Sequence, residues 1–267
     1  DTYGFPVDLT ADIGRERGLN LDLQGFEAEM NKQRDRARAA SKFDAVNEVT
    51  IKTDFETSFE GYNLTQCKTN VVGLFNKGVA VESLKDKDEG AVVLTTSPFY
   101  AESGGQIGDS GIIEFDSGSF IVQDTQKHDK AIIHYGLVQD GNISVGNDVK
   151  AKIDIERRRA IMLNHSATHL LHASLKNVLG EHVIQKGSYV GYDRLRFDFS
   201  HEKNVSQQEL NEIENMVNTE IRNNNPAETK LMGYEDAVSS GALALFGEKY
   251  DEEVRVLSFG DFSIELC

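Results

Sequence analysis

The sequence predicts an α+β protein, and three observations support that prediction. The first residues favour helix, a middle stretch contains short β-type runs between turn residues, and the last part alternates long amphipathic segments with short apolar ones. We therefore divide the 267 residues into three parts. These are a helical segment over 1–48, a small antiparallel β-barrel over 49–155, and an α+β domain over 156–267 with long helices on an antiparallel sheet.

The first part is predicted to be helical. Apolar residues after Pro6 favour a short helix that Gly18 ends. Asp22 then suits the N-cap of a second helix running to about residue 41. Because Phe26 and Met30 fall on one side of that helix and polar residues on the other, we expect it to pack through one face.

The middle part is predicted to contain many short strands, which favour a small barrel or sandwich. The strand-like runs are VVGLF (71–75), GAVVL (90–94), IIEF (112–115), FIV (120–122) and AIIHY (131–135). Turn residues separate them, as in NKG (76–78), DSG (116–118) and DGN (140–142). The loop GGQIG (104–108) lacks the Gly-Lys-Ser/Thr ending of a phosphate-binding loop, so we interpret it as a glycine-shaped turn, with a contact to RNA as the alternative.

The last part is predicted to mix helices and strands. A helix is expected over 157–179, and a second long helix is expected to end at about residue 223 with Ser206 as its cap. A shorter helix is expected over 234–244. Strands are expected near 182–199, 254–258 and 262–266.

Composition limits the classes of function. Hydrophobic residues make up 39% and charged residues 27%, which is ordinary for a globular protein, and no apolar run approaches the ~20 residues of a membrane span. The net charge of −16 excludes nucleic-acid binding through the overall field, so such binding would need a local basic patch. The best candidates are Arg157, Arg158 and Arg159, which alternatively form a solvated helix start. Cys67 and Cys267 lie far apart, and free thiols are favoured over a disulfide.

A pair of histidines is the strongest local signal. His165 and His169 are four residues apart, so on a helix their imidazoles share one face and can converge on one metal ion. Many helices carry such a pair without a metal. The glutamate of the His-Glu-x-x-His protease motif is absent, so a third ligand must come from elsewhere, and Cys267 is the candidate. His128, His134 and His201 are interpreted as surface or strand residues, His172 as a packing residue, and His182 as either a pocket or a strand residue.

Several motifs resemble one family. The runs HSATH (165–169), QKGS (185–188), RFDFS (196–200), ALFGEKY (244–250) and GDFSIELC (260–267) closely resemble the editing domain of bacterial alanyl-tRNA synthetases. PFYAESGGQIGD (98–109) resembles their β-barrel subdomain, and DTYGFP (1–6) resembles the end of their aminoacylation region. The resemblance covers the whole chain in the family's order, and it implies that both ends are cuts in a longer protein.

The resemblance implies a Zn²⁺ site. In the family, a His-x-x-x-His pair and a Cys-x-x-x-His pair hold the metal; the first pair maps onto His165 and His169, and the cysteine onto Cys267. The last histidine would lie four residues beyond Cys267, so three of four ligands are expected here and the zinc is expected to be weakly held or missing. ATP and Mg²⁺ are expected only in the aminoacylation domain, outside this sequence.

The resemblance also implies an activity, which is hydrolysis of tRNA(Ala) wrongly charged with serine or glycine at its acceptor end. A second site is needed because one methyl or hydroxyl group changes binding by only about 1–3 kcal/mol. Gln185 matches a pocket residue of the family, and its amide could orient the substrate amine or a water. The Thr168 hydroxyl could hydrogen-bond a serine hydroxyl or the ester. Without the resemblance, Thr168 is equally well a packing residue on the helix, and Gln185 is favoured as a surface strand residue. The metal could activate water or position the substrate, and positioning is favoured because four protein ligands leave no open position.

Two alternatives to this interpretation stay open. The chain could be a non-catalytic module that positions tRNA, or a free-standing trans-editing deacylase of similar fold, which the synthetase-like residues 1–6 disfavour. If Arg157, Arg158 and Arg159 are more than a solvated helix start, they could offset the acidic field near the site and attract the acceptor end. We further expect a cytoplasmic protein with no membrane partner, and a monomer, because family members associate through regions outside these residues.

Overall fold

The computed structural model describes residues 17–19, 22, 25–26, 29–30, 32, 51, 53–239 and 253–266. The chain divides into two compact units, Asp1–Thr50 and Ile51–Cys267. In the first unit, Asp22 caps a helix as predicted: its carboxylate accepts a hydrogen bond from the Gly25 amide at 2.8 Å, and its carbonyl accepts one from the Phe26 amide at 3.0 Å. The remainder of the two helices predicted before residue 48 lies outside the described residues.

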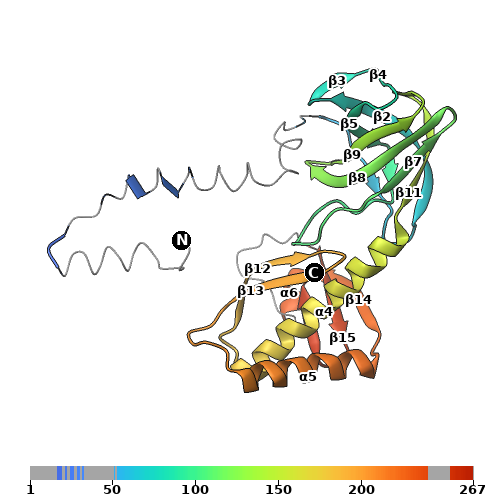
Figure 1. The fold of residues 1–267 in the computed structure, drawn as a ribbon. Coiled ribbons are helices and arrows are strands. Elements are labelled where there is room, and N and C mark those ends of the chain that lie inside the picture. The colour runs from blue at the N-terminus through green and yellow to red at the C-terminus, as the bar shows by residue number, and fades with distance from the viewer. Residues whose placement is uncertain are drawn as a thin grey trace. The chain divides into compact units, whose positions relative to one another are not determined.

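The second unit begins with a closed antiparallel barrel (Figure 1). Its six strands pair in the order β11-β7-β8-β9-β5-β2, and β2 pairs back to β11 to close the ring. Their bounds are β2 (Gln66–Asn76), β5 (Glu89–Leu94), β7 (Gly111–Phe115), β8 (Gly118–His128), β9 (Ala131–Asp140) and β11 (Asp148–Ile153). The barrel predicted from the turn-separated β runs is thus confirmed, and of the two architectures considered the sandwich is excluded.

Shorter strands decorate the barrel. β3 (Val79–Val81) adds to the edge of β2, β1 (Ser58–Phe59) pairs in parallel with β6 (Thr96–Ser97), and β4 (Ser83–Leu84) pairs with β10 (Ile143–Ser144). The barrel interior is apolar because alternate residues of each strand point inward. On β11, for example, Val149 and Ala151 are buried while Lys150 and Lys152 are more exposed.

A long helix follows the barrel directly. α4 (Ile155–Leu179) starts two residues before the predicted position, because the Asp154 carboxylate accepts a hydrogen bond from the Arg157 amide at 3.0 Å and so caps the first turn. Beside α4 lie the hairpin of β12 (Ile184–Val190) with β13 (Leu195–Ser200) and the helix α5 (Gln207–Asn223). Ser206 caps α5 as predicted, in a reciprocal pair with Glu209.

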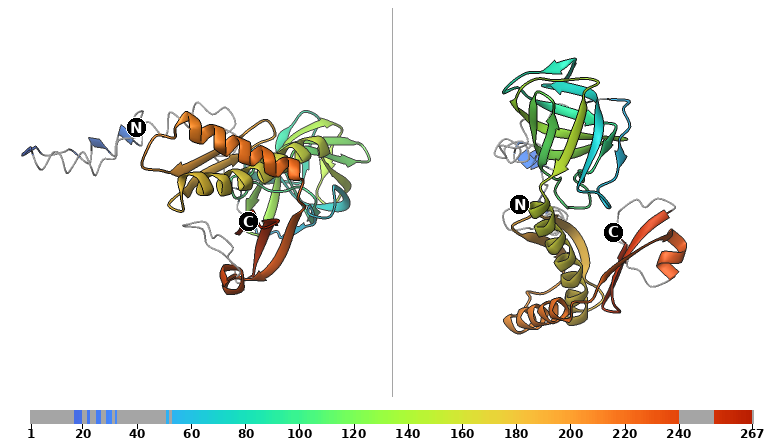
Figure 2. Two further views of the ribbon diagram at one scale, coloured as in Figure 1. Left: turned by 90° about the horizontal axis from the view of Figure 1, so that it is seen from below. Right: turned by 90° about the vertical axis from the view of Figure 1, so that its right-hand side faces the viewer.

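A three-stranded antiparallel sheet completes the second unit. It consists of β14 (Ala227–Gly233), β15 (Glu253–Phe259) and β16 (Ser263–Leu266), with α6 (Tyr234–Ser239) packed on β14 and β15. Figure 2 shows this sheet as a layer separate from the β12–β13 hairpin. The antiparallel pairing is as predicted, but the described strands that follow α4 form two sheets rather than one. Residues 240–244 of the predicted short helix lie outside the described residues.

Candidate metal centre and adjoining cleft

Three histidines form a column on one face of α4. His165, His169 and His172 follow one another at spacings of four and three residues, which a helix places on one side. The rings of His165 and His169 stack with centroids 5.0 Å apart and planes 15° apart. His169 and His172 are buried, and His165 is half-buried. The pair predicted from the sequence therefore does present two adjacent imidazoles.

A buried carboxylate from the last strand binds two members of this column. Glu265 on β16 accepts hydrogen bonds from Nδ1 of His169 at 2.5 Å and from Nδ1 of His172 at 2.9 Å. Burial alone would raise the pKa of Glu265, but the hydrogen bonds from the two histidines outweigh it and lower this pKa to about 2. Because an ionised carboxylate only accepts, the Nδ1 atoms of His169 and His172 carry the protons, which places the basic lone pair of each ring on Nε2.

The barrel supplies the partner of the third histidine. Nδ1 of His165 lies 2.7 Å from Oε1 of Gln106, a buried side chain in the glycine-rich loop. That loop adds to the edge of β12, since Val190 donates to the Gly105 carbonyl at 2.8 Å and accepts from the Ile107 amide at 3.1 Å. Gly105 has a φ of +83°, and a Cβ there would lie 2.7 Å from the Ser188 carbonyl oxygen. The loop is thus the glycine-shaped turn that the sequence predicts.

The Nδ1 partners of His165 and His169 are of the kind that metal-binding histidines use. Metal-binding histidines almost always donate their second nitrogen to a carboxylate or carbonyl oxygen, and Glu265 and Gln106 are such acceptors for His169 and His165. Within residues 53–239 and 253–266 no cluster of three His, Cys, Asp or Glu side chains is arranged to hold a metal. The third expected ligand, Cys267, lies outside the described residues.

Thr168 and Gln185 take different positions around this column. Thr168 is buried beside His169 on α4, and its hydroxyl donates to the Asn164 carbonyl at 2.8 Å, so its oxygen remains able to accept. Gln185 is half-buried on β12 next to a β-bulge, and its Nε2 donates to Ser188 Oγ at 3.3 Å. Its described contacts therefore join it to the hairpin and not to the histidines.

The three arginines at the start of α4 have separate roles. Arg158 is largely buried, and its guanidinium bonds both oxygens of the buried Asp109 and the carbonyls of Gly61 and Pro98, which fixes the helix to the barrel. Arg157 donates to the Gly108 carbonyl at 2.7 Å and lies over the ring of Tyr192. Only Arg159 is well exposed, in a surface pair with Glu156.

A cleft of about 480 Å³ opens beside His165. Its described lining combines barrel, α4 and sheet residues and includes no carboxylate. The lining residues are Gly61, Tyr62, Tyr100, Ser103, Gln106, Arg158, Met162, His165, Ser166, Ala227, Thr229, Arg255, Leu257 and Phe259. Since the whole chain carries a net charge of −16, this cleft is a local exception to the acidic surface.

Comparison with known proteins identifies the family. The sequence pattern of the family described as "tRNA synthetases class II (A)" matches residues 1–157, which is more than half of the chain. The chain belongs to this synthetase family. The alanine–tRNA ligase of Shewanella loihica (strain ATCC BAA-1088 / PV-4) is 52% identical over 267 residues, which is 100% of this chain and 30% of that ligase. The resemblance to alanyl-tRNA synthetases inferred from the motifs is thereby confirmed across the whole chain.

Two residues that bind the α4 histidines, Glu265 and Gln106, are not among those predicted from the sequence. Glu265 and Gln106 lie within motifs that carry the resemblance, but their contacts are not predictable locally, because the histidines that they bind lie 96 and 59 residues away in sequence. For Glu265 the sequence offers one signal, a charged residue between the apolar Ile264 and Leu266, where an unpaired buried charge would be costly. Among the described helices of the synthetase, none is long and apolar enough to span a membrane.

Proposed function

We propose that this chain is the post-transfer editing region of an alanine–tRNA ligase, which hydrolyses the ester of Ser-tRNA(Ala) and Gly-tRNA(Ala). The observation that supports the proposal best is the orientation of His165 and His169. Each is fixed through Nδ1 by a partner from a different part of the fold, and His165 lines a cleft free of carboxylates among its described residues. The 52% identity to an alanine–tRNA ligase agrees with it.

The proposed metal is Zn²⁺, held by Nε2 of His165 and His169 together with Cys267, which follows Glu265 by two residues in the sequence. When bound, the ion would supply a positive charge that holds and polarises the aminoacyl ester. Of the two roles considered from the sequence, we favour positioning of the substrate over activation of water. Glu265 would act through His169, by holding its ring orientation and tautomer.

In the proposed reaction, water adds to the ester carbonyl and the bond between that carbon and the ribose oxygen breaks. The products are the free amino acid and tRNA with its terminal hydroxyl restored. Thr168 would recognise the seryl side chain: its own proton is donated to the Asn164 carbonyl, so its oxygen would accept from the seryl hydroxyl. Gln185 would orient the amino group or the water from the hairpin side.

Deacylation of Ser-tRNA(Ala) and Gly-tRNA(Ala), with Ala-tRNA(Ala) as the cognate control, tests the proposal. We expect hydrolysis of the two mischarged species, and loss of at least about 100-fold in rate for His165→Ala, because the substrate would no longer be held in place. Zinc content measured by mass spectrometry should fall in the same variant. His128→Ala, in the barrel at β8, is the matched control and should retain both rate and zinc.

Absence of deacylation by a zinc-loaded protein, including one extended beyond residue 267, would contradict the proposal. It would favour the non-catalytic tRNA-positioning module. Hydrolysis without dependence on His165 would instead reject the ligand assignment. For the longer proteins to which the chain is related, we propose that ATP and Mg²⁺ serve a separate aminoacylation region. We further propose that the chain acts in the cytoplasm as a monomer, and that of the three arginines Arg159 is the one able to contact tRNA.

A further inference from the structure

A supported tyrosine stands at the mouth of the cleft beside His165. The Tyr62 side chain is 62% exposed, although Tyr is usually partly buried. Its ring packs edge-to-face with that of Phe59, with centroids 4.9 Å apart and an angle of 79° between the ring planes. Phe59 in turn contacts Tyr100, with ring centroids 6.1 Å apart. Tyr62 and Tyr100 both line the cleft, so the barrel presents an aromatic edge to it.

An arginine from the three-stranded sheet lies on this tyrosine. The guanidinium carbon of Arg255 is 3.9 Å from the centroid of the Tyr62 ring. On β15, Arg255, Leu257 and Phe259 alternate along one face and line the cleft, whereas the intervening Val254 and Val256 are buried in a separate core with Ala237. The strand therefore carries one cationic and two apolar side chains toward the cleft.

The charge of Arg255 is available to a ligand. Within the described part of the chain, Arg255 forms no ion pair with a carboxylate, in contrast to Arg158, whose charge is matched by Asp109. A guanidinium can stack on an aromatic ring and still bond a phosphate at its edge. The cleft thus offers a π surface and an unmatched positive charge together, which are the two elements that bind single-stranded nucleic acid.

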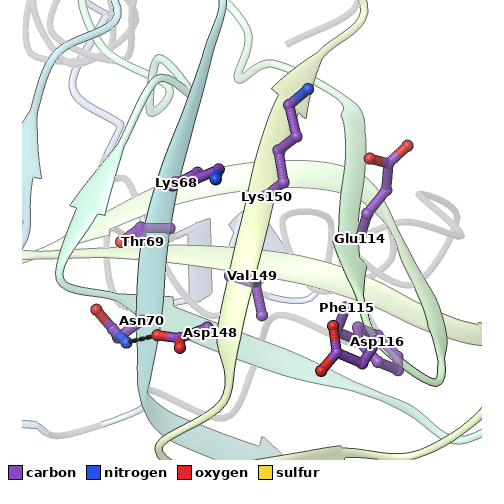
Figure 3. A pocket seen from close by; sticks show the side chains of 9 residues that line it. All are labelled: Lys68, Thr69, Asn70, Glu114, Phe115, Asp116, Asp148, Val149 and Lys150. Atoms are coloured by element: carbon purple, nitrogen blue, oxygen red, sulfur yellow. Dashed lines mark hydrogen bonds between the residues drawn. The ribbon is translucent and has the colours of Figure 1, made fainter.

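A second cavity of the barrel provides the contrast. It measures about 610 Å³ and lies where β2, β7 and β11 adjoin (Figure 3). Lys68 and Lys150 line it, but so do Glu114, Asp116 and Asp148, and Asp148 bonds Asn70. Carboxylates accompany the lysines of this cavity, and its described lining residues include no tyrosine. It therefore offers neither an unmatched positive charge nor a tyrosine ring for stacking.

We propose that Tyr62 and Arg255 form a stacking platform for one base of the single-stranded 3′ end of an RNA, with Arg255 also contacting the adjacent phosphate. The inference rests on the proposed function, since the aminoacyl ester at that 3′ end would then reach toward His165 in the same cleft. Because every base has a π face, the platform holds the RNA without reading its sequence. It is a positioning site for substrate, and selection of the amino acid would remain with the residues around His169.

The test uses an acceptor-stem minihelix of tRNA(Ala) that carries no amino acid. Its 3′-terminal base is 2-aminopurine, a fluorophore that stacking quenches. The intact 267-residue protein should quench it on binding. Tyr62→Leu and Arg255→Met should weaken the Kd by about 5- to 100-fold and relieve the quenching, whereas Tyr62→Phe should retain both. Tyr192→Leu is the matched control: this tyrosine is 56% exposed and also lies under an arginine, but it does not line the cleft.

The outcomes separate the platform from the proposed function. If the wild type binds and quenches the minihelix but never deacylates Ser-tRNA(Ala), the proposed function fails and the platform stands. If the wild type deacylates while Tyr62→Leu keeps the wild-type Kd and quenching, the platform is rejected and the editing function stands. A wild type that binds the minihelix without quenching, or does not bind it, also rejects the platform. Because Tyr62 is exposed, its variants should fold, which circular dichroism checks.

Discussion

His134 in the barrel and the three histidines of α4 differ in how their rings are held. His134 lies inside the barrel on β9, fully buried, and both of its ring nitrogens are bonded there: Nδ1 lies 2.9 Å from the Val92 carbonyl and Nε2 lies 2.7 Å from the Ser97 hydroxyl. In the α4 column, the fixing bonds of His165, His169 and His172 all run through Nδ1. His134, His169 and His172 are buried and His165 is half-buried; the partners differ, since neutral groups of the barrel bond His134, whereas the carboxylate of Glu265 bonds His169 and His172.

These partners distinguish the barrel histidine from the histidines of the proposed site. Val92 can only accept, so His134 is fixed as the neutral tautomer protonated on Nδ1, and the Ser97 hydroxyl satisfies Nε2. His165 and His169 are oriented through Nδ1, the first by Gln106 from the barrel loop and the second by Glu265 from β16.

The largest effect is expected at the contact that joins α4 to the barrel. Arg158→Met leaves the Asp109 carboxylate buried without its cation, and we expect the free energy of unfolding to fall by about 3–5 kcal/mol. Urea denaturation followed by circular dichroism measures it. Arg159→Met, in an exposed pair one residue along, should change stability by less than about 0.5 kcal/mol. Equal effects of the two variants would mean that the buried pair does not hold α4 to the barrel.

The next effect concerns the barrel histidine and pH. Burial lowers the pKa of His134 from 6.5 to about 4, and the hydrogen bond to Val92 opposes this only in part. Between these two pH values the unfolded chain binds a proton at His134 and the folded protein does not. The free energy of unfolding therefore loses nothing to this histidine well above pH 6.5, and it falls as the pH drops toward 4. His134→Gln should remove about 3 kcal/mol of that loss, measured by urea denaturation at pH 7 and pH 4. Identical losses in variant and wild type would contradict the assignment.

A smaller effect is expected from the carboxylate behind the α4 column. Glu265→Gln keeps the size of the side chain but removes the charge that orients His169 and His172, and zinc affinity should fall by about 10- to 100-fold. Competition with a chromophoric chelator measures it. Glu228→Gln, exposed on β14 of the same sheet, should bind zinc like the wild type. An unchanged affinity in Glu265→Gln would show that the carboxylate does not support the metal ligand.

The smallest effect is expected from the neutral partner of His165. Gln106→Leu removes one uncharged hydrogen bond, worth about 1 kcal/mol, so zinc affinity should fall by about fivefold in the same titration. Ser103→Ala, in the same loop but without a described side-chain bond to a histidine, serves as the control. If Gln106→Leu lowers the zinc affinity more than Glu265→Gln does, then the hydrogen bond from the barrel, and not the carboxylate of β16, contributes most to orienting the histidines.

Local signals in the sequence predicted most elements of this fold. Ser206 as a cap, the β runs of the barrel and the closing strands all depend on residues close in sequence, and the structure contains them. α4 begins two residues before the predicted start because Asp154 caps its first turn. Closure of the barrel could not be predicted locally, since it joins Asn70 on β2 to Asp148 on β11, far apart in the chain.

The candidate site was predictable only in part, for the same reason. The spacing of His165 and His169 is a property of one helix and can be read from five consecutive residues. Their partners Gln106 and Glu265, and the contact of Arg255 with Tyr62, depend on long-range packing that no periodicity encodes. The roles of Thr168 and Gln185 remain predictions, as does that of Cys267.

The loop that pairs with β12 has a consequence for how such a protein can vary over time. Through Gly105 and Ile107, the barrel contributes what amounts to an extra strand on the hairpin, and through Gln106 it holds His165. Genetic exchange that replaced the barrel with one of different loop length would break the hairpin edge and release the histidine together. Barrel and helix should therefore be inherited as one block, with few viable crossovers between residues 103 and 190.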